Sequence, residues 1–259
     1  MKKLLLILLF VFGFTSLYAL QDDRLDDYSY DSSELVTETP PYFAIAGGAT
    51  FTFQFANFDA LNKHIIDKKF DLSDFSGQVN LWGGEGFTGL VYIPNLRVGF
   101  FSYGGSKNIS SNISFEVENE KVKRELEYKV GMTGLSLEYA IVPMKSFAIT
   151  AGISIGRGDL TINSYETIDN ADWNDFIPKA NSSNYLNVAS SNYWLVKPTV
   201  NFEYAITNFL MFRVGASYNS TFAYDWKQNF NSKLNNVPND LNADALQIQA
   251  GIFIGLFNY

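Results

Sequence analysis

Residues 41–57 read PYFAIAGGATFTFQFAN, and their side chains alternate between two faces. One face carries Phe43, Ile45, Ala49, Phe51, Phe53 and Phe55, whereas the other carries Ala44, Ala46, Gly48, Thr50, Thr52 and Gln54. A period of two is typical of a β-strand, because successive side chains point to opposite sides. The stretch therefore predicts a strand with one apolar face and one face of small or polar residues.

The same division recurs at residues 146–156, 194–205, 209–226 and 245–259. Further strands are expected near 79–92, 96–115 and 121–141. Together they make about eight strands, each long enough to cross a bilayer, because a tilted strand needs roughly 9–11 residues. The region 114–126 could be an external hairpin or part of the wall, so the sequence does not fix the number of strands.

The connections between these strands alternate in length. Short turns are expected at 93–95, 142–145 and 207–208, and long polar loops at 57–76, 166–192 and 227–244, with a short connection at 119–121 as the exception. This alternation predicts an all-β fold, a closed up-and-down antiparallel transmembrane β-barrel with short periplasmic turns and long external loops. A soluble β-sandwich or lipocalin-like barrel is the alternative. It would repeat Lys and Glu on the second face, which here is mostly small and polar.

The start of the chain predicts export. Lys2 and Lys3 precede an apolar run from Leu4 to Phe14, which favours a signal peptide over residues 1–19. An uncleaved anchor helix is the alternative, but the run is shorter than a membrane span. Residues 20–41 are acidic and expected to form a disordered leader, so residues 42–259 remain for the barrel. The net charge of -8 disfavours nucleic acid as a partner, and the absence of cysteine excludes disulfides and thiolate metal sites.

The sequence ends on GLFNY. Phe253, Phe257 and Tyr259 are separated by even numbers of residues, so they share one face of the last strand. This ending resembles that of small eight-stranded outer-membrane barrels of the OmpA/OmpX type. The resemblance implies an outer-membrane location, contact with membrane lipid and lipopolysaccharide, a monomer, and recognition of Tyr259 by the barrel-assembly machinery. The three aromatic residues fall on the face expected to point inward, so either this strand carries a bulge or its faces are reversed.

Charged residues on the small and polar face are expected to form a cluster inside the barrel. Arg97, Glu138, Glu203 and Arg213 each lie a few residues from a short turn, which places them at similar height. Lys197 would lie above them with Gln247 and Gln249. Because a barrel of this size is filled by side chains and an unpaired buried charge is costly, ion pairing should plug the lumen. A catalytic role for Glu138 or Glu203, or a narrow pore, is the alternative.

Residues 84–89 read GEGFTG and fit the glycine pattern of a dinucleotide site. That pattern requires a following helix, whereas Leu90–Tyr92 continues a strand and residues 93–95 turn it back, so a nucleotide is not expected. If residues 93–95 form the whole loop, Tyr92 pairs with Leu96 and Leu90 with Val98. Glu85 then points into the lumen with Arg97.

The resulting hypothesis is a barrel with a structural or surface-interaction role through its external loops, without catalysis, cofactor or metal. An enzyme acting on envelope lipid, a narrow channel and a soluble lipocalin-like carrier are the alternatives. His64 is the one imidazole, in a short helix-like stretch, and has no serine at a recognisable spacing. The acidic segment 169–175 lacks the glycine and the closing glutamate of a calcium loop.

Overall fold

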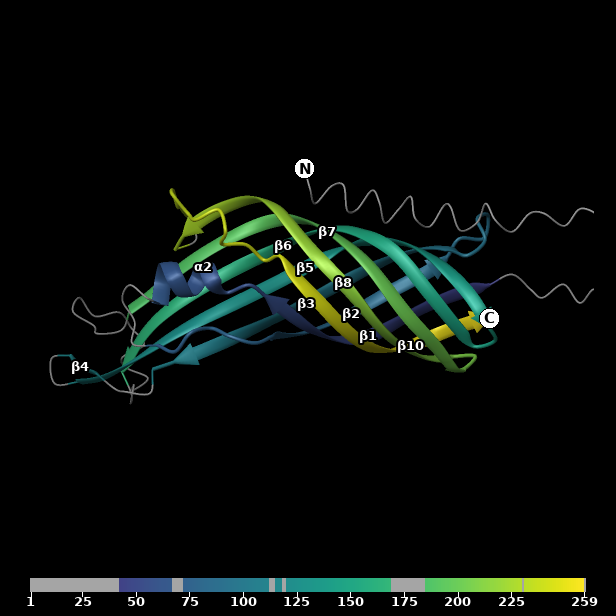
Figure 1. Cartoon of the computed structure of the whole chain (residues 1–259), viewed down its shortest axis with the longest axis horizontal. Coiled ribbons are helices and arrows are strands. Elements are labelled where there is room, and N and C mark those ends of the chain that lie inside the picture. Colours follow the sequence, from purple (N-terminus) through teal and green to yellow (C-terminus); the bar gives the residue numbers. More distant parts are fainter. Residues whose placement is uncertain are drawn as a thin grey trace, which may run out of the picture. The chain divides into compact units, whose positions relative to one another are not determined.

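The fold was established from a computed structural model, which describes residues 42–66, 72–111, 115–117, 120–168, 185–229 and 231–258. The expected signal peptide, the whole expected leader, the acidic segment 169–175 and Tyr259 lie outside these residues. The strands are β1 (Phe43–Ala56), β2 (Val79–Gly89), β3 (Leu96–Ser110), β4 (Phe115–Val117), β5 (Glu120–Met144), β6 (Phe147–Ile168), β7 (Tyr185–Thr207), β8 (Leu210–Gln228), β9 (Ser232–Lys233) and β10 (Ala245–Asn258) (Figure 1).

Eight of these strands form a closed ring in which each strand is antiparallel to its neighbours. The order is β1, β2, β3, β5, β6, β7, β8 and β10, and β10 pairs with both β8 and β1 (Figure 1). The two short strands β4 and β9 extend β5 and β8 outside the ring. The closed up-and-down barrel expected from the alternating pattern is therefore confirmed.

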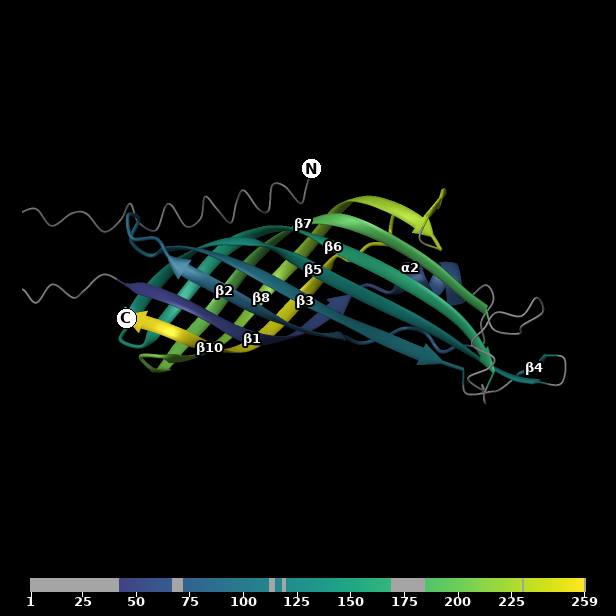
Figure 2. The ribbon, with the colours of Figure 1, turned by 180° about the vertical axis from the view of Figure 1, so that it is seen from behind.

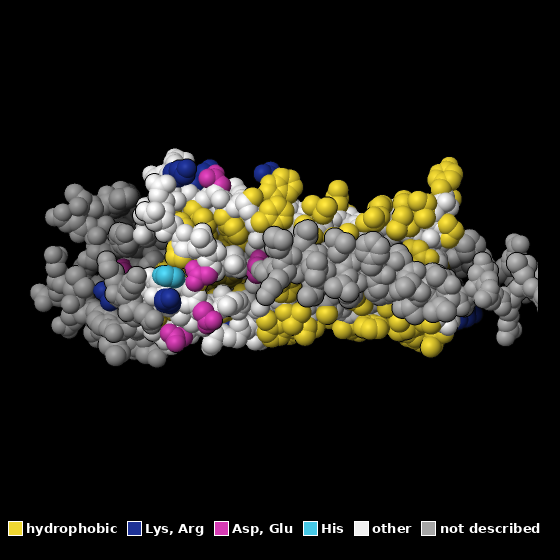
Figure 3. Space-filling view, turned by 45° about the horizontal axis from the view of Figure 1, so that its top comes forward, with side chains coloured by type: hydrophobic (Ala, Val, Ile, Leu, Met, Phe, Trp, Pro, Cys, Tyr) yellow, Lys and Arg dark blue, Asp and Glu magenta, His cyan; other side chains and the backbone are white. Residues whose placement is uncertain are grey.

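The two faces of the wall are distributed as the alternation predicted. Large apolar side chains point outward from every strand of the ring, as with Trp82, Leu135 and Ile254, which are 69%, 71% and 68% exposed. Figure 3 shows these side chains gathered along one part of the wall, whereas polar and charged surface dominates the end that carries the loops. An apolar outer band around a polar lumen is the arrangement of a transmembrane barrel, and such barrels lie in outer membranes. The soluble carrier required the reverse arrangement and is excluded.

The last strand follows the same rule. Its pairing with β1 runs without interruption from Phe43 opposite Asn258 to Ala56 opposite Ala245, so β10 carries no bulge. Phe253 and Phe257 are buried inside the barrel. The inward face assigned from the alternation is thus right, and the ending departs from an outward-facing aromatic terminus at these two positions.

Two strands are longer than the marked alternation, and a third resolves the undecided region. β6 continues to Ile168 and β7 begins at Tyr185, whereas the alternation marked only 146–156 and 194–205. β5 begins at Glu120, so the undecided region contributes both the β4–β5 hairpin and, from Leu126 on, buried wall. These extensions lie beyond the apolar band, where the outer face is polar and apolar residues such as Leu126, Leu160 and Ile162 are buried inside, so the two faces exchange their character.

Loop 57–78 fills the external mouth of the barrel in its described parts. It begins with a short helical segment, α2 (Asp59–Leu61) followed by the π-helix η1 (Asn62–Ile66). Phe58, Leu61 and Phe75 pack into an apolar cluster with wall residues such as Tyr128, and the Asn62 amide bonds the backbone of Phe75 in both directions. Among the described residues, no helix is long and apolar enough to cross a membrane.

Candidate functional site

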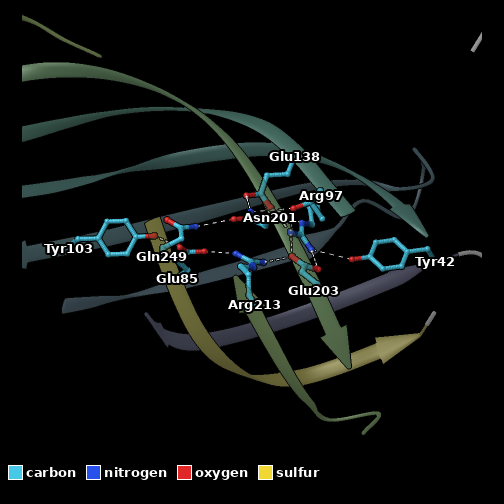
Figure 4. Close-up of polar contacts among 10 residues, drawn as sticks. Tyr42, Glu85, Arg97, Tyr103, Glu138, Asn201, Glu203, Arg213 and Gln249 are labelled. Carbon is cyan, nitrogen blue, oxygen red and sulfur yellow. Dashed lines mark hydrogen bonds and ion pairs between the residues drawn. The ribbon is translucent and has the colours of Figure 1, made fainter. Parts of the chain in front are cut away.

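The charged residues expected inside the barrel lie at inward positions of five strands. β2 supplies Glu85, β3 Arg97, β5 Glu138, β7 Lys197 and Glu203, and β8 Arg213. The side chains of this set that form ion pairs are at most 9% exposed, and those of Arg97 and Glu203 are 0% exposed. We call these six residues the charged layer, and Figure 4 labels all of them except Lys197.

Arg97 is the centre of the charged layer. Its Nε donates to Glu138 Oε2 at 2.7 Å, Nη1 donates to Glu203 Oε2 at 2.9 Å, and Nη2 donates to Glu203 Oε1. Nη1 also reaches the Tyr42 hydroxyl at 3.1 Å (Figure 4). Planar guanidinium N–H groups match carboxylate oxygens two at a time, so this arrangement satisfies a buried cation on three sides.

Arg213 joins the second half of the layer to the first. Its Nη1 donates to Glu85 Oε2, and its Nη2 lies 2.8 Å from Glu203 Oε1. Glu85 in turn accepts from the Tyr103 hydroxyl. A continuous chain therefore runs from Tyr103 through the acids and arginines to Glu138, and Glu203 is shared between the two guanidinium groups (Figure 4).

The structure corrects one expected pairing. Glu85 lies inside the barrel, but its cationic partner is Arg213, not Arg97. Gly89 pairs with Arg97 and Thr88 with Val98, so the β2–β3 hairpin is shifted by two residues from the expected register. The reason is the turn: Leu90 N donates to Leu96 O, and the loop takes all of Val91–Asn95. A shift by two keeps every side chain on its own face.

Lys197 behaves differently from the two arginines. Its Nζ lies 3.9 Å from the centre of the Phe101 ring and 4.7 Å from that of Tyr103, and no carboxylate lies within 4.0 Å of it among the described residues. It borders a cavity of about 10 Å³, which has room for about one water molecule. The aromatic faces thus stabilise this ammonium where an ion pair is missing.

Several members of the network were not expected from the sequence. Tyr42, Tyr103, Thr150 and Asn201 hydrogen-bond within the charged layer, and the Phe87 ring lies 4.1 Å from the Arg97 guanidinium carbon. Above them, Gln249 bonds Asn201 and Gln247 bonds Gln54. Inward parity would have identified Tyr103 and Asn201, which share a strand face with Arg97 and Glu203, and Thr150, which lies on the small and polar face of β6.

The remaining candidates do not join the charged layer. His64 lies in η1 at the external mouth, and its Nε2 is 3.8 Å from Asp240 Oδ1. No group of three potential metal ligands occurs in the part of the chain that the structure describes. The charged layer is buried, and each of its carboxylates has a cationic or hydrogen-bonding partner, so its geometry is that of a structural ion-pair network.

No protein-family model matches the chain, and no curated protein matches it. The fold is similar to that of a major outer membrane protein from Thermus thermophilus, with a TM-score of 0.44 and 11% identity over 82% of this chain and 99% of that chain. It is also similar to Ail of Yersinia pestis (TM-score 0.35, 8% identity, 84% and 98% covered) and to CarO2 of Acinetobacter baumannii (0.31, 11%, 82% and 99%). These similarities are distant, so the assignment as an outer-membrane barrel rests on the strand order and surface of the chain itself.

Proposed function

We propose that the protein is a monomeric outer-membrane barrel with a sealed lumen, which acts as a structural or surface-interaction protein through its external end. The observation that carries the proposal is the charged layer, in which both arginines are paired and buried. The described parts of loop 57–78 pack in the mouth above it, so side chains fill the lumen over the described residues. The surface left for interaction is the external one, where β5, β6 and β7 project beyond the apolar band.

Conductance across a planar bilayer tests the sealed lumen. Purified full-length protein should give no stable conductance steps, because opening a path would require separating buried charges from their partners. Stable steps would contradict a sealed lumen and support the narrow channel. As a positive control, an established porin in the same membrane should conduct.

Catalysis on envelope lipid is tested separately. Incubation of the folded protein with phospholipid in mixed micelles should release no fatty acid or transfer product, with the His64→Asn variant as the matched control. Product that forms with the natural chain and disappears in the variant would establish an enzyme and overturn the proposal.

The surface role itself is tested in cells. Cells that carry the full chain should differ from cells that lack it in attachment to surfaces or in resistance to detergent. If neither property changes at equal levels of folded protein in the outer membrane, the proposed role is wrong.

A further inference from the structure

The loop Val91–Asn95 between β2 and β3 carries the two most exposed large apolar side chains among the described residues. Val91 and Tyr92 are 80% and 97% exposed, and the next residue, Ile93, is 51% exposed. The loop lies at the end of the barrel where the described chain begins and ends, and Figure 2 shows it, in blue, extending beyond the wall. Consecutive apolar residues with this exposure mark an interaction surface on a folded protein.

The loop is held in place at its base. Leu90 N donates to Leu96 O at 2.8 Å, and Ala140 N on the neighbouring β5 donates to Asn95 O at 2.8 Å. Asn95 has a φ of 65°, a left-handed conformation that asparagine tolerates better than most residues. The three apolar side chains are therefore presented on a fixed turn.

The neighbouring turns at the same end of the barrel carry fewer apolar residues. The β5–β6 connection consists of Lys145 and Ser146, and the β7–β8 connection of Asn208 and Phe209 after Thr207, with Phe209 60% exposed. A run of three consecutive exposed apolar residues is thus a property of the β2–β3 loop, whereas the β7–β8 turn presents a single aromatic ring.

The exposed loop is continuous with the lipid-facing band. On β3 the outward residues that follow it are Val98 and Phe100, which are 38% and 60% exposed, and the adjoining β5 contributes Tyr139 and Leu137. A tyrosine between aliphatic residues suits the membrane–water interface, where its ring is buried in lipid and its hydroxyl reaches the headgroups. Membrane lipid is therefore the occupant that the position and chemistry of the loop fit.

We propose that the loop Val91–Asn95 is a lipid anchor. Val91, Tyr92 and Ile93 enter the interface of the periplasmic leaflet and fix the depth of the β2–β3 side of the barrel. The anchor is an interaction of the periplasmic end and does not depend on the surface role proposed for the external end.

Because the chain has no cysteine, single-cysteine spin labels test this directly. The variants are Tyr92→Cys in the loop, Phe100→Cys in the lipid-facing band and Lys145→Cys in a polar turn, each in lipid nanodiscs that hold one barrel. The label at position 92 should lose access to a water-soluble nickel reagent and gain access to oxygen, relative to position 145 and in the direction of position 100. Nickel access equal to that at position 145 would overturn the anchor.

Two controls keep the result decisive. Each labelled variant must show the gel shift of the folded barrel on heating, and Val91→Cys replaces Tyr92→Cys if the latter does not fold. Spin–spin broadening at position 92 that vanishes on dilution with unlabelled protein would show contact with a second copy and contradict the proposal. Since purified protein in nanodiscs lacks any periplasmic partner, a water-exposed label there would favour such a partner over lipid.

Discussion

Arg97 and Glu203 are 106 positions apart in the sequence, yet two N–H groups of the guanidinium donate to the two carboxylate oxygens. Both side chains are fully buried. They come from strands on different sides of the lumen, so the pair joins opposite parts of the wall. The pair can form only after those strands have taken their places in the ring.

Replacing Arg97 with Met should strongly destabilise the barrel. Glu203 would keep Arg213, but Glu138 would lose its direct cationic partner, and an uncompensated buried charge typically costs about 3–5 kcal/mol. The urea midpoint for unfolding in lipid vesicles measures the effect. An unchanged midpoint would show that the charged layer does not hold the wall together.

Replacing Lys197 with Met should cost much less than the Arg97 substitution. The substitution removes the contacts of the ammonium with the Phe101 and Tyr103 rings, which are worth about 0.5–2 kcal/mol. It does not strand a carboxylate that was paired directly with Lys197. The same urea titration compares the two variants. A loss as large as that of Arg97→Met would mean that Lys197 has an essential anionic partner.

The adjacent glycines 47 and 48 give a matched pair for testing the close approach of β1 and β10. A Cβ on Gly48 would lie 2.2 Å from Ile252 O and 2.7 Å from the Phe253 ring, whereas a Cβ on Gly47 meets nothing closer than 3.8 Å. Gly48→Ala should therefore destabilise by about 1–3 kcal/mol through overpacking. Gly47→Ala should stay within about 1 kcal/mol of the natural chain. Equal effects in urea titrations of the two variants would contradict this account.

Acid should loosen the external part of β5 and β6. Burial acts to raise the pKa of Glu127, but hydrogen bonds from Asn163, Tyr165 and Ser106 outweigh it, and the pKa lies below its usual value. A carboxyl with a lowered folded pKa stabilises the fold above its unfolded pKa, and this contribution is lost as pH falls through the folded pKa. Because the site is partly exposed, the contribution should be below about 1 kcal/mol.

Hydrogen-exchange protection of the β5 and β6 amides around Glu127 and Asn163 measures this loss. Protection should fall between about pH 6 and about pH 3, on either side of the normal carboxyl range. Glu127→Gln should flatten the profile without changing protection in the membrane-spanning part of the strands. An acid-dependent loss that persists in this variant must come from another group.

The membrane-spanning wall could be predicted because lipid outside and a packed lumen inside impose a strict difference between alternate residues. β1 shows this difference along its whole length and β10 shows it as far as Ile252, and the faces of both strands were assigned correctly. The external ends of β6 and β7 were not found this way, since water meets their outer face and the apolar residues, such as Leu160, Ile162 and Val188, lie on the inner face instead. Strand length beyond the membrane depends on pairing between segments, which one segment does not encode.

The charged residues of the candidate site could be predicted, but the ion pairs between them could not. Parity along each strand placed Glu85, Arg97, Glu138, Lys197, Glu203 and Arg213 on the lumen face. Which acid meets which base depends on the stagger of the strands around the whole ring, and Glu85 meets Arg213 of β8, a strand that is not its neighbour. Tyr42 was missed because it precedes the first strand, and no pattern there indicates its orientation.

The seam between β1 and β10 places the first and last strands of the barrel side by side along their full length. A chain that has not yet reached Ala245 leaves unpaired the edges of β1 and β8 that β10 would join. Such a chain would expose two rows of open backbone groups, which lipid cannot satisfy. Closure of the ring therefore needs the whole stretch from β1 to β10, and a copy truncated before β10 should remain an open sheet.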